Sequence, residues 1–236
     1  MGIIKDIFPV FNKQRITFVR KSSEIADINS FFFTYSPTLS WKAGQHGIIS
    51  FPNKLKGRSW RAFSLASSPE EKLIMISTRI IDKPSAFKKA LMSLNPGEQV
   101  TLRGPFGPFY IDDSNKPVIF IAGGIGITPF RALIRYSIEH KNISPKIIRL
   151  LYSDDKLEYA FRDEFDKITS VNDFISIDYT SKTFLHAKII DCVKEFGNNA
   201  FYYISGSSKM VGSIKKELIA SGVLKKNVKQ DVFFGL

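Results

Sequence analysis

The chain contains very little cysteine and histidine. Its single cysteine, Cys192, excludes an internal disulfide framework and any iron-sulfur cluster held by four thiolates of this chain. The three histidines, His46, His140 and His186, lack the spacing of metal ligands. We therefore expect neither a disulfide scaffold nor a metal site.

Long hydrophobic runs are also absent. The longest, from Val118 to Ile127, is interrupted by glycines and is far shorter than the roughly 20 residues that a membrane-spanning helix needs. The first residues, Met1 to Lys13, lack a basic region followed by an apolar stretch and a cleavage site. We expect no transmembrane segment and, by default, a cytoplasmic protein. The 44% of apolar residues is ample for ordinary packed cores.

The net charge of +12 is distributed unevenly. Residues 1 to 112 hold 16 basic and 8 acidic residues, a net charge of +8, and the remainder carries +4. Such a field favours an acidic partner by electrostatic steering. Because no basic motif with interleaved aromatic residues accompanies the charge, we expect no binding to nucleic acid.

The first half has the rhythm of short strands separated by turn residues. Six of them at short spacing predict an antiparallel β-barrel. One helix is predicted between the last two strands, from Ser85 to Leu94, with Ser85 as a possible cap and the stop signal Asn95-Pro96-Gly97. The predicted strands are 15 to 21, 30 to 35, 46 to 51, 61 to 67, 72 to 80 and 99 to 104.

The second half alternates strands with helical patterns, which predicts a Rossmann-like parallel sheet covered by helices. The polar, turn-rich stretch from Asp112 to Pro117 separates the two rhythms. We therefore predict two domains, 1–112 and 113–236. The strands of the second are expected over 117 to 123, 146 to 153, 173 to 181, 200 to 206 and 228 to 236.

A glycine-rich turn follows the first strand of the second half. Gly123, Gly124 and Gly126 allow a tight turn and a close approach to a pyrophosphate, while Thr128 and Pro129 suit the first positions of a helix. The usual dinucleotide fingerprint has Gly or Ala where Pro129 stands. Glycine-rich turns of this kind also serve packing alone, so the turn by itself leaves both interpretations open.

A second strand-to-helix turn, Tyr203 to Val211, contains a glycine and three serines. In an open parallel sheet both turns emerge at the carboxyl edge, where such folds bind ligands. Two turns on one edge favour a dinucleotide site over either turn alone. Met210 in the second turn is equally well interpreted as a core residue of the following helix.

Taken in order, these and several further short motifs closely resemble the ferredoxin-NADP reductase family over nearly the whole chain. Each motif is weak alone, and their joint order and spacing carry the resemblance. They are Trp41-Lys42-Ala43-Gly44-Gln45, Arg61-Ala62-Phe63-Ser64, Gly104-Pro105-Phe106-Gly107, the turn from Gly123 to Pro129, the turn from Ser205 to Met210, and Asp231-Val232-Phe233-Phe234-Gly235.

The resemblance implies that the barrel binds FAD, or less often FMN, through Arg61-Ala62-Phe63-Ser64. Arg61 would pair with the flavin phosphates, for which its planar set of donors is suited. Phe63 replaces a frequent Tyr and would stack on the isoalloxazine or ribityl region. Ser64 would direct its hydroxyl to the flavin nitrogen that accepts the hydride. A solvated arginine and a surface serine are the alternatives.

Two further flavin contacts follow from the resemblance. Ser85 and Ala86 at the start of the lone barrel helix would offer free N–H groups to the pyrophosphate. Thr78 and Arg79 resemble a second flavin-contacting stretch, although Arg79 is nearly as well interpreted as an exposed strand residue.

On the nicotinamide side, Ser205 occupies a position where the family often has Cys, and it would position the ring beside Gly206. Ser181 and Lys182 suit a ribose 2′-phosphate, which slightly favours NADPH, although Lys182 could simply be solvated. Phe233, or less favourably Phe234, would cover the flavin face that nicotinamide approaches. The alternative for this tail is ordinary core packing.

The resemblance implies a reductase that accepts a hydride from NADH or NADPH and releases electrons singly. Because one cysteine cannot hold a cluster, the acceptor must be separate, such as an acidic ferredoxin or flavodoxin. The runner-up is the reductase component of an oxygenase or of a membrane redox system. A flavin- or nucleotide-binding regulator without turnover is the rival from another class. The oligomeric state stays open.

Overall fold

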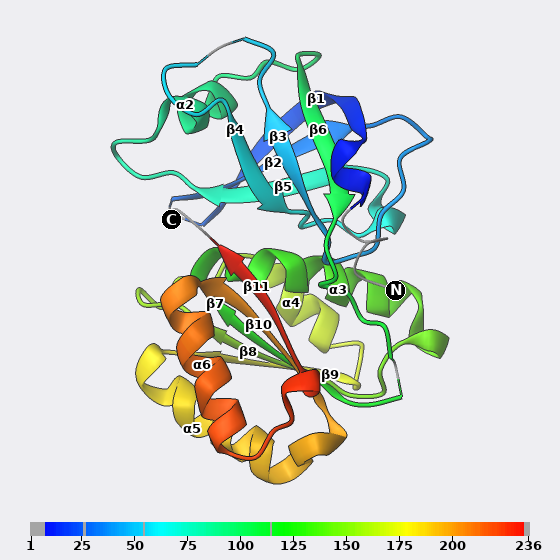
Figure 1. The fold of residues 1–236 in the computed structure, drawn as a ribbon, viewed down its shortest axis with the longest axis vertical. Helices are drawn as coiled ribbons and strands as arrows, with labels where there is room; N and C mark the ends of the chain where they lie inside the picture. The colour runs from blue at the N-terminus through cyan, green and yellow to red at the C-terminus, as the bar shows by residue number, and fades with distance from the viewer. Residues whose placement is uncertain (1–7, 26, 54, 114, 234–236) are drawn as a thin grey trace. The chain divides into compact units, whose positions relative to one another are not determined.

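The structure is a computed structural model that describes residues 8–25, 27–53, 55–113 and 115–233 (Figure 1). The chain divides into two compact units. The first comprises Met1–Tyr110 with Arg131–Tyr136, and the second comprises Ile111–Phe130 with Ser137–Leu236.

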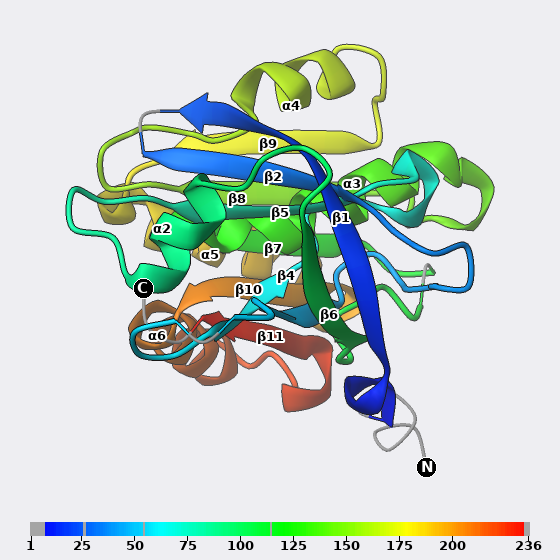
Figure 2. The ribbon, with the colours of Figure 1, turned by 90° about the horizontal axis from the view of Figure 1, so that it is seen from above.

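The first unit is a six-stranded antiparallel sheet that curls into a half-barrel (Figure 2). The strand order is β4-β3-β6-β1-β2-β5, so β4 and β5 are the two edges of an open sheet. This confirms the antiparallel architecture predicted for the first half. The strands are β1 (Lys13–Ile25), β2 (Ile28–Thr34), β3 (His46–Ser50), β4 (Trp60–Ser64), β5 (Ile74–Arg79) and β6 (Gln99–Phe106).

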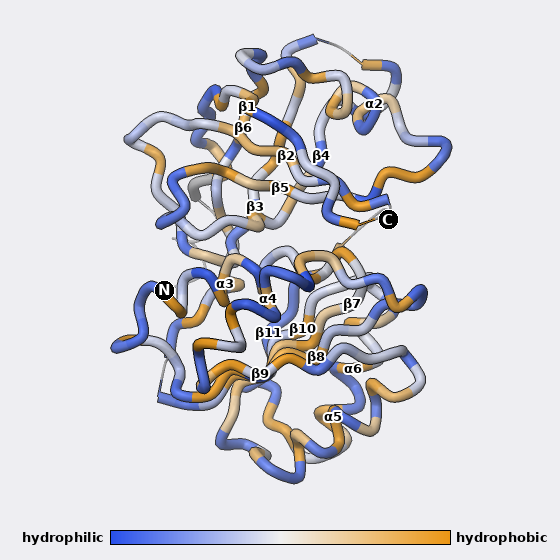
Figure 3. The backbone as a smooth tube through the Cα atoms, turned by 180° about the vertical axis from the view of Figure 1, so that it is seen from behind, coloured by the Kyte–Doolittle hydropathy of each residue, from blue (hydrophilic) through white to orange (hydrophobic). Residues whose placement is uncertain are grey.

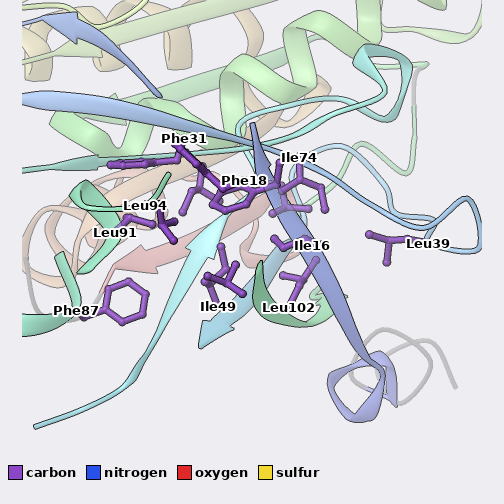
Figure 4. Close-up of a cluster of buried hydrophobic side chains, with 14 of the residues drawn as sticks. Ile16, Phe18, Phe31, Leu39, Ile49, Ile74, Phe87, Leu91, Leu94 and Leu102 are labelled. Atoms are coloured by element: carbon purple, nitrogen blue, oxygen red, sulfur yellow. The ribbon is translucent and has the colours of Figure 1, made fainter. Parts of the chain in front are cut away.

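Alternation of apolar and polar residues determines which face of these strands is buried. In β1, Ile16 and Phe18 are buried while the residues between and beside them are more exposed, as expected of a strand with one face on a core. The core gathers side chains from β1, β2, β3, β5, β6 and α2 (Ala86–Met92), including Phe87 and Leu91 (Figure 4). Ser85 caps α2 by accepting a hydrogen bond from the Lys88 N–H at 3.4 Å, which confirms the predicted cap.

The second unit is a five-stranded parallel sheet in the order β11-β10-β7-β8-β9, with helices on its faces. This confirms the parallel sheet predicted for the second half. Its strands are β7 (Val118–Gly123), β8 (Ile148–Ser153), β9 (Ile175–Thr180), β10 (Phe201–Ser207) and β11 (Val228–Phe233). Its helices are α3 (Thr128–Glu139), α4 (Arg162–Thr169), α5 (Lys182–Phe196) and α6 (Ser208–Ala220), and α3 also supplies the segment that clusters with the first unit.

Strands buried on both faces explain the continuous apolar runs of this half. Residues 118 to 122 of β7 are all fully buried. In Figure 3 much of this sheet has the orange colour of hydrophobic residues. Buried side chains of α5 and α6 cover one face, with Ile121 and Ile204 in the same cluster. On the other, Phe130 of α3 stacks on Phe120 at 4.7 Å between ring centroids. Over the described part of the chain, no helix combines the length and apolarity needed to cross a bilayer.

Candidate functional site

Strand β4 places the predicted flavin-binding residues along one edge of the half-barrel. Arg61 and Phe63 are half-buried on one face, and Ser64 at the strand end is only 5% exposed. Ala62 between them is exposed. The Arg61 guanidinium donates hydrogen bonds to the carbonyls of Arg58 at 3.3 Å and of Trp60 at 2.8 Å. Arg61 is therefore held against the backbone at the start of β4 and just before it.

The first turn of α2 meets this strand through Phe87. The Phe63 and Phe87 rings lie 5.9 Å apart between centroids, with an angle of 32° between their planes. The Arg61 guanidinium lies 5.6 Å from the centre of the Phe87 ring. The fold thus brings Arg61 and Phe63 together with the start of the helix at Ser85 and Ala86, as the resemblance implies.

Lys88 belongs to the same place and was not predicted from the sequence. Its Nζ donates to the Arg79 carbonyl at 2.8 Å. Burial lowers the pKa of Lys88, and the neighbouring Arg61 and Arg79 guanidinium groups lower it further, against an opposing effect of Asp27. Sequence reasoning missed Lys88 because it is one of two adjacent lysines on a helix, and only folding brings the two arginines to one of them.

The two residues of the second predicted flavin-contacting stretch, Thr78 and Arg79, have different surroundings in the structure. Arg79 lies at the end of β5, forms a 3.0 Å ion pair with Asp27 and contributes to the cationic group around Lys88. Thr78 is only 7% exposed and pairs with Asn29 in the sheet. Of this pair, Arg79 is the residue that the structure joins to the cationic group.

In the second unit, the two predicted turns meet at the carboxyl edge of the sheet. β7 and β10 are neighbours, with Ala122 opposite Ser205. A Cβ atom on Gly126 would lie 2.3 Å from the Ser205 carbonyl oxygen, and one on Gly123 would lie 2.0 Å from the Met210 sulfur. A side chain on either glycine would clash with the other turn. Both glycines therefore serve packing, and they also allow the two turns to approach each other closely.

The glycine turn leads into a helix at the residue predicted. A short 3-10 helix, Gly124–Ile127, precedes α3, which starts at Thr128 with Pro129 as its second residue. The Thr128 hydroxyl donates to the Ile125 carbonyl at 3.2 Å. A glycine-rich turn that enters the N-terminus of a twelve-residue helix is an arrangement suited to anions.

Two buried hydroxyl groups flank the glycine turn. Ser205 on β10 is fully buried and Ser153 at the end of β8 is 2% exposed. Among the described residues, neither Oγ has a hydrogen-bond partner. Since a buried polar group without a partner costs free energy, these hydroxyls suit a site that a polar ligand completes. Ser153 was missed because a serine that ends a strand is unremarkable in sequence.

Of the two predicted ribose-phosphate residues, Lys182 has an acidic neighbour. Ser181 is the N-cap residue of α5, and the Lys182 ammonium forms an ion pair with the Asp155 carboxylate, both side chains being largely exposed. Asp154 is buried, and a Cβ on Gly124 would lie 3.6 Å from its Oδ2. Asp155 lies 27 residues from Lys182 in sequence, so only the fold reveals this ion pair.

The predicted tail residue Phe233 is the last described residue of β11. It is half-buried and lies opposite Ser207 in the parallel pairing with β10. Phe234, the less favoured alternative, lies outside the described residues. Among the residues that the structure describes, no group of three or more His, Cys, Asp or Glu side chains is arranged to hold a metal ion.

No protein-family model matches the chain. The chain is 29% identical over 217 residues to one component of the Na(+)-translocating NADH-quinone reductase of Neisseria meningitidis, a match that covers 81% of this chain and 53% of that protein. The chain thus spans about half the length of the curated relatives it matches.

Solved structures are similar over almost the whole chain. The ferredoxin-NADP+ reductase from Plasmodium falciparum matches with a TM-score of 0.81 and 17% identity, over 97% of this chain and 99% of that one. A flavohemoglobin from Malassezia yamatoensis with bound FAD and heme matches with a TM-score of 0.75 and 17% identity, over 94% of this chain and 60% of that one.

Proposed function

Because this chain has the fold of the ferredoxin-NADP+ reductases, we propose that it is a flavin-dependent reductase that takes a hydride from NADH or NADPH and passes electrons singly to a separate acceptor. The observation that supports the proposal is that the chain contains two groups of residues, one suited to a flavin and one suited to a nicotinamide dinucleotide. The half-barrel holds a cationic and aromatic group around Arg61, Phe63 and Lys88, and the parallel sheet holds two interlocked turns at its carboxyl edge.

The residues of the first unit fit FAD. Arg61 and Lys88 offer positive charge to phosphates, and the half-buried Phe63 offers an aromatic face for stacking. The hydroxyl of the buried Ser64 is suited to the hydride-accepting nitrogen. When bound, the flavin accepts two electrons as a hydride and releases them one at a time.

The residues of the second unit fit a nicotinamide dinucleotide. The N–H groups at the start of α3 suit a pyrophosphate, and the glycine turn gives it room. The buried Ser205 hydroxyl is suited to hydrogen bonding with the nicotinamide end. In this proposal, the main contribution of the chain is to align two bound rings.

An anaerobic titration tests the proposal directly. The protein is saturated with FAD, its visible spectrum is recorded, and NADH and NADPH are added in separate cuvettes. Bleaching of the flavin absorbance by at least one coenzyme is expected. A yellow protein that neither coenzyme bleaches, and that reduces no ferricyanide, would instead favour a flavin-binding regulator without turnover.

An acidic one-electron carrier such as ferredoxin or flavodoxin is the acceptor that the charge favours. With a net charge of +8 in residues 1 to 112, electron transfer to such a carrier should slow as ionic strength rises. The measurement is the rate of carrier reduction between low and physiological salt, with uncharged dye reduction as the control. A rate independent of salt would contradict this choice and leave a membrane redox partner or an oxygenase as the alternative.

The coenzyme preference should respond to the Asp155 carboxylate. Lys182 is proposed to bind a ribose 2′-phosphate, yet Asp155 partly neutralises it. Asp155→Asn should therefore improve kcat/KM for NADPH over NADH about three- to fivefold, the size expected of one exposed ion pair. The double variant with Lys182→Met is the control and should lose this gain. An equal change for both coenzymes would show that the pair does not face the 2′ position.

A further inference from the structure

Three cationic side chains from three different elements converge where the two edge strands of the half-barrel, β4 and β5, approach each other. Arg61 comes from β4, Arg79 from the end of β5 and Lys88 from the first turns of α2. The Lys88 Nζ is 2.8 Å from the Arg79 carbonyl oxygen, and the Arg61 guanidinium lies 5.6 Å from the ring of Phe87, the residue next to Lys88. Both arginines lie close enough to disfavour the charged form of Lys88.

This cluster is poorly neutralised by the protein itself. Asp27 forms a 3.0 Å ion pair with Arg79, and it is the carboxylate that acts on Lys88. Within the described ranges, neither Arg61 nor Lys88 forms an ion pair with a carboxylate. Like charges held together in a half-buried place cost free energy, and a bound polyanion would offset this cost.

The donors that remain available match a diphosphate. An ammonium group has three N–H donors, and the Arg79 carbonyl accepts one of them from Lys88. A guanidinium group has five, of which Arg61 directs only Nη1 to backbone carbonyls. Two cations with several donors each suit the adjacent phosphate groups of a diphosphate better than a neutral ligand.

We propose that Lys88 is a phosphate-binding residue that receives the diphosphate of FAD together with Arg61. The inference rests on the proposed function and goes further, because it assigns the recognition of FAD over riboflavin to a lysine on α2. Lys88 acts on binding and does not touch the reacting atoms. Its neighbour Lys89, which is exposed, provides a matched control.

The first test compares Lys88→Met with Lys89→Met in the full chain by fluorescence titration with FAD and with riboflavin. Lys88→Met should weaken FAD binding about tenfold or more, the loss expected of a hydrogen bond to a charged group, and should leave riboflavin binding unchanged. Lys89→Met should change neither. Circular dichroism checks that both variants fold, and Lys88→Gln serves as a second variant if the methionine variant does not.

The second test uses pH. The charged groups that face Lys88 are Arg61, Arg79 and Asp27, and the two arginines stay charged at all accessible pH values. A bound diphosphate raises the pKa of Lys88 above its lowered value in the free protein. FAD affinity should therefore be constant below the free-protein pKa and fall as the pH rises through the pKa of the complex, and Lys88→Met should abolish this fall.

The outcomes separate the two hypotheses. If the parent protein binds no flavin, the proposed function fails. If it binds FAD and Lys88→Met binds it equally well at every pH, the assignment of Lys88 is wrong while the proposed function stands. An equal loss of FAD and riboflavin affinity would show that Lys88 supports the flavin ring and would also overturn the inference.

Discussion

Replacing Gly126 with alanine should destabilise the second unit by about 3 kcal/mol or more, because the new methyl group would clash with backbone atoms that cannot move aside. Its Cβ would lie 2.3 Å from the Ser205 carbonyl oxygen and 2.8 Å from the Gly206 Cα. Both obstacles are backbone atoms of β10, which is fixed by ladders to β7 and β11. Relief requires the two turns to separate, so binding of NADH and NADPH should be lost as well.

Gly123 offers a contrasting case at the same contact. A Cβ there would lie 2.0 Å from the sulfur of Met210, which belongs to a flexible side chain. Gly123→Ala should therefore be destabilising alone and be largely restored by Met210→Ala, whereas Gly126→Ala should not be rescued by Met210→Ala. Gly212 in α6 is the matched control, since its Cβ would meet nothing within 4 Å and alanine there should stabilise by up to ~1 kcal/mol.

Thermal unfolding followed by circular dichroism measures these effects, and hydrogen exchange of β7 and β10 locates them. The two tryptophans, Trp41 and Trp60, both lie in the first unit, so their fluorescence reports that unit separately. Wild-type stability and coenzyme binding in Gly126→Ala would contradict the interlocked turns.

The second large effect is expected at the ion pair of Arg131 and Glu71. Arg131 groups with the first unit, is 7% exposed, and donates to both Glu71 carboxylate oxygens, at 2.9 and 3.1 Å. It also donates to the Ala66 carbonyl at 2.8 Å, and Glu71 accepts the Ser68 N–H at 2.8 Å. Glu71→Ala should cost about 3 to 5 kcal/mol, because it removes both carboxylate oxygens that accept hydrogen bonds from a buried guanidinium.

A double-mutant cycle separates the pair from its surroundings. Arg131→Met and Glu71→Ala are combined, and tryptophan fluorescence monitors urea unfolding of the first unit. The double variant should be more stable than Glu71→Ala alone, since the buried positive charge that loses the Glu71 carboxylate is then removed as well. Strict additivity of the two single changes would rule out the coupling.

Local features of this protein are determined by its sequence. The alternation around Ile16 and Phe18 predicts a half-buried strand, and the cap at Ser85 and the helix start at Thr128 follow from side-chain and backbone chemistry within a few residues. The sequence predicts an antiparallel and a parallel sheet because strands of the two kinds differ in their pattern of apolar residues and in the elements that connect them. Short-range patterns of this kind survive folding because they depend on neighbours in sequence.

What only the tertiary structure decided depends on residues that are distant in sequence. The strand order places β4 and β5 at the edges of the sheet, and the sequence of neither strand predicts this position. Lys88 differs from Lys89 only because the fold carries Arg61 and Arg79 to it, and Lys182 is partly neutralised by a carboxylate 27 residues away. Electrostatic interactions and close contacts depend on distances in space between residues that are far apart in sequence, so no local sequence pattern predicts them.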